Sequence, residues 1–529
     1  MRGFRIKNMK VEEINREEKL KNVNSENIVE ENLQCNLPGV PQKKSLMSFV
    51  HEIVFVAVLC SAQLSTMAAL ALSIAPINII GKSFGTSNPG QLSWFTAAHS
   101  LTVGTFILIA GRLGDIFGHK RLFISGFLWF ALWSLLAGFS VYSDAIFFDI
   151  CRAFQGMGPA FAVPNAIAIL GRTYSPGWKK NLVFSMFASC APTGFVFGSV
   201  FSSLLSRFVW WPWSFWIMAI FCLLLAILGF LVIQNSPVPE RDHSSKLYEQ
   251  VDIFGSISGV SGLILINFAW NEAPVVGWQK PYNYVLLIVG ALCMGLFVFF
   301  EYKAAYPLVP LKSLSNDAAF MLGCVGVGWS SFGIWIYYSW MFMLNIKKYP
   351  PLLCSAHFFP VCLSGTCAAV TAGYLLKHYP GSVIMICAMI AFTVGLILMS
   401  TVPVHQVYWA QFFVSVIVMP WGMDMSFPSA TIVLSDQMPG EHQGLAASLV
   451  NTMVNYSISI GLGIAGTVES HLNEGGRNVL KGYRSAMYTG IGLAGLGITL
   501  ASWYSIKTYF KRRNKSSTAF LGFSKTSYS

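Results

Sequence analysis

The sequence is poor in charged residues. Of its 529 residues, 11% are charged and 54% are hydrophobic, whereas a soluble domain usually carries about 25% charged residues. The mean hydropathy is +0.57. Because so little charge cannot give several soluble cores a polar surface, we exclude the three soluble domains that the length alone would suggest.

The sequence also lacks the motifs of several kinds of chemistry. Its eleven cysteines form no Cys-x-x-Cys pair, which argues against a zinc site and a disulfide framework. Neither a Walker-type phosphate loop nor a dinucleotide fingerprint occurs. With no cluster of nucleophiles or metal ligands either, we expect no enzyme, no metal and no cofactor. Any energy for an activity must come from a gradient.

Long apolar segments dominate instead. A bilayer core of roughly 30 Å requires about 20 apolar residues per helix, and the sequence supplies about fourteen such segments. The first begins near Val50, after a polar segment, so no cleavable signal peptide is expected. The predicted fold class is all-α, a polytopic membrane protein. The predicted spans are 52–80, 92–110, 122–140, 145–171, 181–205, 212–233, 253–271, 283–300, 318–344, 352–376, 382–402, 406–434, 445–468 and 485–507.

The net charge of +12 could indicate a nucleic-acid partner, but the distribution of the basic residues argues otherwise. They gather in both tails and in alternate loops, as in Lys120, Arg121 and Arg512, which is the positive-inside pattern. We therefore expect a lipid bilayer and no nucleic acid as partner, with both termini cytoplasmic. The segment with Arg477, Lys481 and Arg484 is an exception, because the span count places it outside.

A short internal repeat suggests two related halves. The segment Gly158–Leu170 reads GPAFAVPNAIAIL, and Gly422–Leu434 reads GMDMSFPSATIVL. The repeat matches span 4 with span 12, as expected for two parallel six-helix halves separated by two extra spans. The predicted division is a disordered cytoplasmic tail at 1–48, a six-helix half at 49–233, a linker with two extra transmembrane helices at 234–317, a second six-helix half at 318–508, and a basic, Ser-rich cytoplasmic tail at 509–529.

The loop after span 2 carries the most specific motif, GRLGDIFGHKR from Gly111 to Arg121. Glycines permit a tight turn between close helices, and a carboxylate can accept hydrogen bonds from a helix N-terminus. The alternative is an ordinary positive-inside loop. We interpret the motif as a conformational lock, with Asp115 near the start of span 13 at Gly444. Its residues are Gly111, Asp115, Gly118, Lys120 and Arg121.

Polar residues inside the spans are the candidates for a solute or proton pathway. An Arg at bilayer depth costs on the order of 3 kcal/mol unless it is paired or wet, so Arg152 should face the interior with Gln155 and Asp149 on the same helix face. A relay and a structural Asp149–Arg152 pair both remain open. Asp424 lies between two helix-breaking prolines and can be functional or a backbone cap. The full candidate set is Gln63, Arg152, Gln155, Asn165, Trp335 and Asp424.

These motifs resemble those of the major facilitator superfamily. The loop motif, the RAFQGMG segment of span 4 and the span count resemble its 14-span drug–proton antiporter branch. Longer runs, GRLGDIFGHKRLF, MPWGMDMSFP and GEHQGLAASLVNTMVNYSISIGLG, are similar to fungal aminotriazole-resistance and boron-export-type transporters, with relatives linked to low-affinity ammonium transport. Two positions depart from the branch: Gln63 replaces an acid of span 1, and the antiporter motif near Pro192 is degenerate.

The resemblance implies a major facilitator fold and a secondary active transporter of a small polar solute. Ammonium, boric acid or borate, and aminotriazole-like drugs are the candidate solutes, with protons as the coupling ion and alternating access as the mechanism. The alternatives are a passive facilitator and a nutrient sensor without transport. We expect a monomer in the plasma membrane, with the vacuolar membrane as the alternative.

Overall fold

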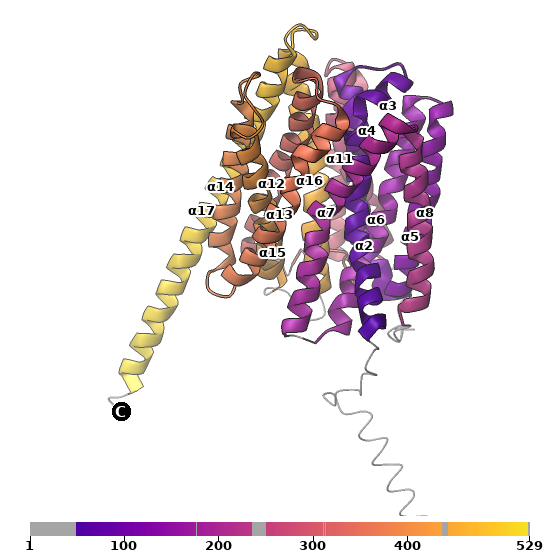
Figure 1. Cartoon of the computed structure of the whole chain (residues 1–529). Helices are drawn as coiled ribbons and strands as arrows, with labels where there is room; N and C mark the ends of the chain where they lie inside the picture. The colour runs from indigo at the N-terminus through magenta and orange to yellow at the C-terminus, as the bar shows by residue number, and fades with distance from the viewer. Residues whose placement is uncertain are drawn as a thin grey trace, which may run out of the picture. The chain divides into compact units, whose positions relative to one another are not determined.

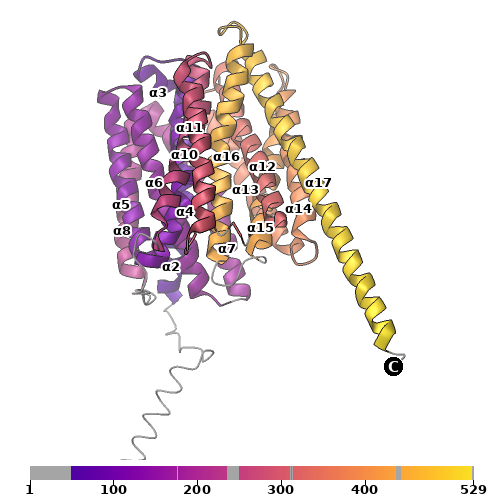
Figure 2. The same cartoon turned by 180° about the vertical axis from the view of Figure 1, so that it is seen from behind.

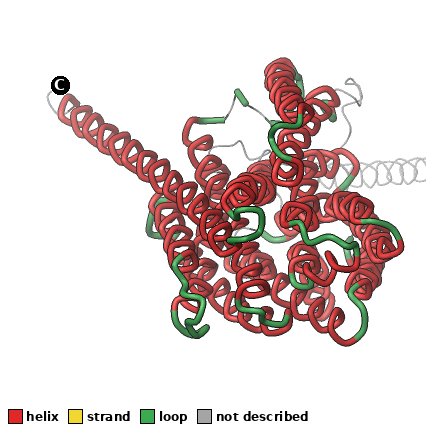
Figure 3. The backbone as a smooth tube through the Cα atoms, turned by 90° about the horizontal axis from the view of Figure 1, so that it is seen from above, coloured by secondary structure: helices red, strands yellow, loops and turns green. Residues whose placement is uncertain are grey.

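The computed structural model describes residues 49–175, 177–234, 250–309, 311–312, 314–435 and 443–526. Within these ranges all regular structure is helical and no strand occurs (Figure 3). The elements are α2 (Phe49–Ile74), α3 (Ile77–Ser83), α4 (Pro89–Phe117), α5 (His119–Phe139), η1 (Ser140–Tyr142), α6 (Ala145–Thr173), α7 (Trp178–Phe208), α8 (Pro212–Val232), α10 (Ile253–Val276), α11 (Pro281–Lys303), α12 (Asn316–Met341), η2 (Phe342–Ile346), α13 (Pro351–Leu375), α14 (Gly381–Ser400), α15 (Gln411–Ser435), α16 (Gln443–Leu472) and α17 (Val479–Thr526).

Thirteen of the described helices are long and apolar enough to cross a membrane. The fourteenth long helix, α16, is not among them, and its described part carries buried polar side chains, including Asn451, Thr452 and Asn455. The all-helical polytopic fold predicted from the sequence is therefore confirmed. The predicted tail at 1–48 lies outside the described residues. The predicted tail at 509–529 begins as a continuation of α17 (Figure 1).

Local signals in the sequence explain several helix starts. Asn88 caps α4 by accepting a hydrogen bond from Gly90 N at 2.9 Å, and Asp144 caps α6 by accepting one from Phe147 N at 2.7 Å. Side-chain oxygens at this position satisfy backbone donors that have no partner in the first turn. Pro89 at the start of α4 fits the first helical turn, where no N–H is required.

Two elements differ from the predicted spans. The first span was predicted to run to residue 80, but α2 ends at Ile74 and a separate short helix, α3, follows Pro76. The ninth span ends in the π-helix η2, a form that is uncommon and often found at functional positions. Pro76 is a sequence signal for the first break, whereas the apolar run around η2 contains no proline or glycine that would signal the second.

Val54–Ser529 forms one compact unit, and within it two helix pairs pack in matching ways. Gly158 of α6 lies against Phe130 of α5, because a methyl group built on this glycine would lie 2.5 Å from the Phe130 side chain. Gly422 of α15 lies against Phe392 of α14 at 2.7 Å. The sequence repeat pairs these two glycines. In both copies of the repeat, the first glycine leaves room for a phenylalanine of the preceding span. The boundaries of the two halves stay a prediction.

Helices far apart in the sequence meet along two seams. The first joins α4 to α16, where a methyl group on Gly104 would lie 2.5 Å from Tyr456 N. The second joins α7 to α13, where the hydroxyls of Ser203 and Ser355 are 2.9 Å apart. Small residues permit such close backbone approach in membranes.

The two extra spans lie beside the α4–α16 seam (Figure 2). The α10 helix bonds to both sides of it, because Trp94 Nε1 donates to Glu272 Oε2 at 3.0 Å and Asn271 Nδ2 donates to Ser459 O at 3.2 Å. By contrast, only 11% of the most apolar stretch of α11 is buried within the bundle. We infer that α10 is a structural part of the bundle and that α11 faces lipid.

Candidate functional site

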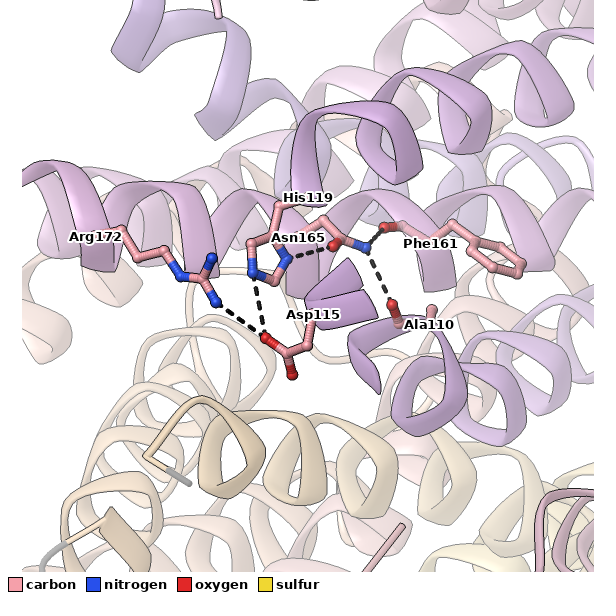
Figure 4. A network of polar contacts seen from close by, with 6 residues as sticks. All are labelled: Ala110, Asp115, His119, Phe161, Asn165 and Arg172. Carbon is pink, nitrogen blue, oxygen red and sulfur yellow. Dashed lines mark hydrogen bonds and ion pairs between the residues drawn. The ribbon is translucent and has the colours of Figure 1, made fainter. Parts of the chain in front are cut away.

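The loop motif forms a polar network at one end of the bundle (Figure 4). Asp115 Oδ1 lies 3.0 Å from Arg172 Nη2 and 3.4 Å from His119 Nε2. These residues come from the end of α4, the start of α5 and the end of α6. Asp115 and Arg172 are each about half exposed, so water screens this pair and it adds little to stability. The network therefore ties three helix ends together in a way that can be broken at low cost.

Asn165 belongs to this network. Its Oδ1 lies 2.7 Å from His119 Nδ1, and its Nδ2 donates to Phe161 O at 2.7 Å. The residue is fully buried. Gly114 is required here because a side chain would overlap both Asn165 and His119. The sequence grouped Asn165 with the solute pathway, but its contacts join it to the loop motif.

The other motif residues hold the turn. Gly118 has φ +96°, a left-handed value that favours glycine. Lys120 lies 5.3 Å from the ring of Phe230 on α8, and Arg121 is exposed. A methyl group built on Gly111 would lie 3.2 Å from Ser448 Oγ, near the start of α16. The predicted approach of Asp115 to Gly444 lies outside the described side chains.

Arg152 is fully buried and joins three helices. Its Nε donates to Phe95 O on α4 at 2.9 Å, its Nη2 donates to Ala69 O on α2 at 2.9 Å, and its Nη1 donates to Gln155 Oε1. Gln155 continues the chain by donating to Ser134 Oγ on α5 at 2.7 Å. Arg152 and Gln155 thus act as one cross-link among α2, α4, α5 and α6.

The Asp149–Arg152 pair considered from the sequence is absent from the described contacts. One carboxylate oxygen of Asp149 is buried without a hydrogen-bond partner among them. The described hydrogen bonds from Arg152 go to the carbonyl oxygens of Phe95 and Ala69, to Ser73 and to Gln155. The geometry therefore favours a structural role for Arg152. Its partners are not Asp149, as the sequence suggested, but backbone carbonyls, Ser73 and Gln155.

Trp335 is also held within the bundle. Its Nε1 donates to Ser415 Oγ on α15 at 2.8 Å, and Ser415 Oγ donates to Gly395 O at 2.7 Å. The ring is 1% exposed and meets Phe358 edge-on at 5.5 Å. These contacts fix the packing of α12 against α13, α14 and α15.

Asp424 lies near the middle of α15 at the α7–α13 seam. A methyl group built on Gly365 of α13 would lie 2.8 Å from Asp424 Oδ2 and 3.0 Å from Pro192 Cγ of α7. Oδ2 is buried and has no hydrogen-bond partner among the described residues. A carboxylate in a span is costly without a partner, so this oxygen can accept a proton or a cationic solute.

Gln63 lies on α2, which packs against α7. The neighbouring Leu64 carbonyl contacts Gly194, two residues after Pro192. Gln63 is partly exposed. Of the six candidates, Gln63 and Asp424 therefore flank the α7–α13 seam. Arg152 and Asn165 lie about 20 Å apart along α6 by helical rise, so the six do not form one cluster.

Some residues of the site carry no signal that sequence reasoning could have used. Thr193 Oγ1 and Cys362 Sγ meet across the same seam at 3.1 Å, yet each looks like an ordinary span residue. No group of three metal-ligating side chains occurs in the described part of the chain.

A bundle of membrane-spanning helices with two seams and a polar loop network defines a membrane transporter. The chain belongs to the Major Facilitator Superfamily, whose family model matches residues 54–382 and 319–528. The family resemblance of the sequence motifs is thus confirmed.

Individual relatives are fungal transporters. The chain is 61% identical over 503 residues to a "Low affinity ammonium transporter" of Saccharomyces cerevisiae, covering 93% of this chain and 98% of the relative. It is 47% identical to "Efflux pump terJ" of Aspergillus terreus, covering 88% and 90%. It is 38% identical to the "Aminotriazole resistance protein" of Saccharomyces cerevisiae, covering 89% and 86%.

A solved structure agrees on the fold. The human organic anion transporter MFSD10 superposes with a TM-score of 0.57 at 14% identity, covering 85% of this chain and 99% of that one. At this identity the likeness bears on the fold alone.

Proposed function

We propose that this chain carries ammonium, or a cation of similar size, across the plasma membrane by alternating access. The observation that carries the proposal is the buried, unpartnered Oδ2 of Asp424 at the α7–α13 seam. A carboxylate in this position compensates the charge of a desolvated cation. The relative with 61% identity is named an ammonium transporter, which supports the same solute.

A second function is proton-coupled transport of a neutral solute such as an aminotriazole-like compound or boric acid. Relatives named as an efflux pump and an aminotriazole resistance protein favour it. In this scheme Asp424 carries the coupling proton and amides such as Gln63 hydrogen-bond the solute. A passive facilitator would follow the solute's own gradient without a coupling ion, and a sensor would carry no solute.

The variant Asp424→Asn separates these functions. Uptake of labelled methylammonium and of aminotriazole is measured in cells that lack other carriers, at several external pH values, with surface expression monitored. Under the ammonium scheme, the variant carries no methylammonium. Under the proton scheme, pH coupling disappears but solute exchange survives.

The control is Asp149→Asn, which neutralises another carboxylate of the spans away from the α7–α13 seam. We expect it to transport normally. Wild-type transport with unchanged pH dependence in Asp424→Asn would reject both schemes and leave Asp424 as a structural cap.

A further inference from the structure

Another buried carboxylate without a basic partner among the described residues lies away from Asp424, near the end of α16. Glu469 is 2% exposed, and its Oε1 accepts a hydrogen bond from Asn473 Nδ2 at 2.9 Å. The nearby basic residues are engaged elsewhere: Lys481 pairs with Glu474 at 2.8 Å, and Arg484 donates to Val402 O at 3.1 Å. No ion pair reaches Glu469 among the described residues. A buried carboxylate kept without a counterion calls for a function.

The turn after α16 holds this carboxylate in place. Asn473 Oδ1 accepts hydrogen bonds from Gly475 N at 3.0 Å and Gly476 N at 3.2 Å, while its Nδ2 donates to Glu469. Both glycines have positive φ, which larger side chains rarely adopt. Glu469 is thus oriented by a fixed turn before any ligand arrives.

Three tyrosine rings surround the same corner of α12, α16 and α17. The rings of Tyr338 and Tyr483 are 5.6 Å apart, and those of Tyr337 and Tyr338 are 5.2 Å apart. A methyl group on Gly482, the residue before Tyr483, would lie 3.3 Å from Glu469 Oε1. A methyl group built on Gly466, one helical turn before Glu469, would likewise lie 4.0 Å from the Tyr338 hydroxyl.

This corner lies where the first half of the chain closes over the second. Asn345 Nδ2 donates to Tyr483 Oη at 2.7 Å, and Asn78 Nδ2 of α3 donates to Asn345 Oδ1 at 2.7 Å. Tyr337 Oη donates to Pro89 O at the start of α4 at 3.3 Å. These bonds must break when the halves separate at this end, which the charge pattern predicts to be extracellular.

We propose that Glu469, with Tyr337, Tyr338 and Tyr483, forms an entry site for a small monovalent cation. The site opens when the Asn78–Asn345–Tyr483 bridge separates. The carboxylate compensates the charge, and tyrosine faces attract a cation that has shed part of its water. A neutral solute gains nothing from this arrangement, so the site selects cations before they reach Asp424. The inference rests on the proposed ammonium function for the direction of cation movement.

The test uses the full-length chain and methylammonium as the probe. We expect Glu469→Gln to raise the KM for methylammonium by about tenfold or more, the factor for loss of one charge-assisted contact. The maximal rate and the uptake of aminotriazole should stay unchanged. Glu469→Asp, which keeps the charge, should restore most of the affinity. Glu474→Gln, which removes an exposed carboxylate from the same turn, is the matched control and should resemble the wild type.

Equilibrium binding of methylammonium to purified protein separates this inference from the proposed function. Under the inference, Asp424→Asn abolishes transport but retains binding that Glu469→Gln then removes. An unchanged KM in Glu469→Gln would overturn the entry site and leave the role of Asp424 standing. Equal losses for methylammonium and aminotriazole would also overturn it, because they would indicate a structural role. Binding unaffected by both substitutions would reject both proposals.

Discussion

At the scale of single residues, Arg152 is a fully buried charge in the bundle. Its guanidinium has no carboxylate within ion-pair distance among the described residues, and it is stabilised by carbonyl oxygens of α2 and α4, by Gln155 and by the ring of Phe215 at 5.7 Å. A planar fork of donors can serve several acceptors in fixed directions. The arrangement is that of a cross-link, and a relay would leave at least one donor free for a solute.

We expect Arg152→Leu to lower the free energy of unfolding by about 2–4 kcal/mol, because several charge-assisted bonds are lost and Gln155 Oε1 loses its donor. Arg152→Lys should be nearly as destabilised, since one ammonium cannot reach the same acceptors. Thermal stability of the detergent-solubilised protein measures this. A stable Arg152→Lys protein with altered pH dependence of transport would instead support a relay.

Some of the polar residues discussed above could be singled out from the sequence, and others could not. Asp424 could be found because an acid between two prolines in an apolar run is rare, and Arg152 stood out for the same reason. Glu469 was missed because an acid near the end of a span resembles an interfacial residue. Asn165 was assigned to the solute pathway because its true partners, His119 and the carbonyls of Ala110 and Phe161, are defined only by the packing of α4, α5 and α6.

At the scale of helices, apolar length predicted nearly every span because the bilayer fixes the number of residues required. The break at Pro76 was not predicted because the span was assigned by apolar length alone, although a proline can end a helix. The π-helix η2 was not predicted because span length does not report this change of helix type. η2 carries Asn345, which bonds to Asn78 and Tyr483. The loop motif was recognised as a unit, but its ion-pair partner Arg172 was seen only as a loop charge.

The Asp115–Arg172 pair links the ends of α4 and α6, and it should control the rate at which these ends move. We expect Asp115→Asn to lower the transport rate while changing stability by no more than about 1 kcal/mol, since the pair is half exposed. Initial uptake rates and thermal stability, measured on the same preparations, give both quantities.

Arg172→Gln is the decisive companion to this variant. If the ion pair is the functional contact, Arg172→Gln slows transport equally and the double variant is no slower than either single one. If Asp115 acts through the start of α16, Arg172→Gln transports like the wild type. Full activity of Asp115→Asn would remove the lock from the mechanism altogether.

At the scale of the whole chain, two seams connect helices from distant parts of the sequence, and the candidate solute site lies on the α7–α13 seam. Sequence patterns predicted the number of spans and the repeat, yet which helices form the seams depends on close glycine contacts such as Gly104 against Tyr456. The extra helix α10 could be counted but not placed, because its buried Asn267 and Asn271 find partners only in the folded bundle.

The orientation of the bundle in the membrane is a further prediction for the whole chain. Both termini should be cytoplasmic, and the loop with Lys347 and Lys348 external, because basic residues concentrate on the side of the tails. The segment with Arg477, Lys481 and Arg484 is the exception to this rule. In the folded protein two of its charges are occupied, since Lys481 pairs with Glu474 and Arg484 bonds to Val402 O.

Lys347 is similarly engaged, because its Nζ donates to Gln406 O and burial lowers its pKa. We therefore expect basic residues at this end to be compensated locally, so that they do not reverse the orientation set by the tails. Reporters of sidedness inserted at both termini and at Glu474 measure it. The expected pattern is cytoplasmic, cytoplasmic and external in that order. An external C-terminal reporter would overturn the even number of spans, and a cytoplasmic reporter at Glu474 would place the entry site on the wrong side for uptake.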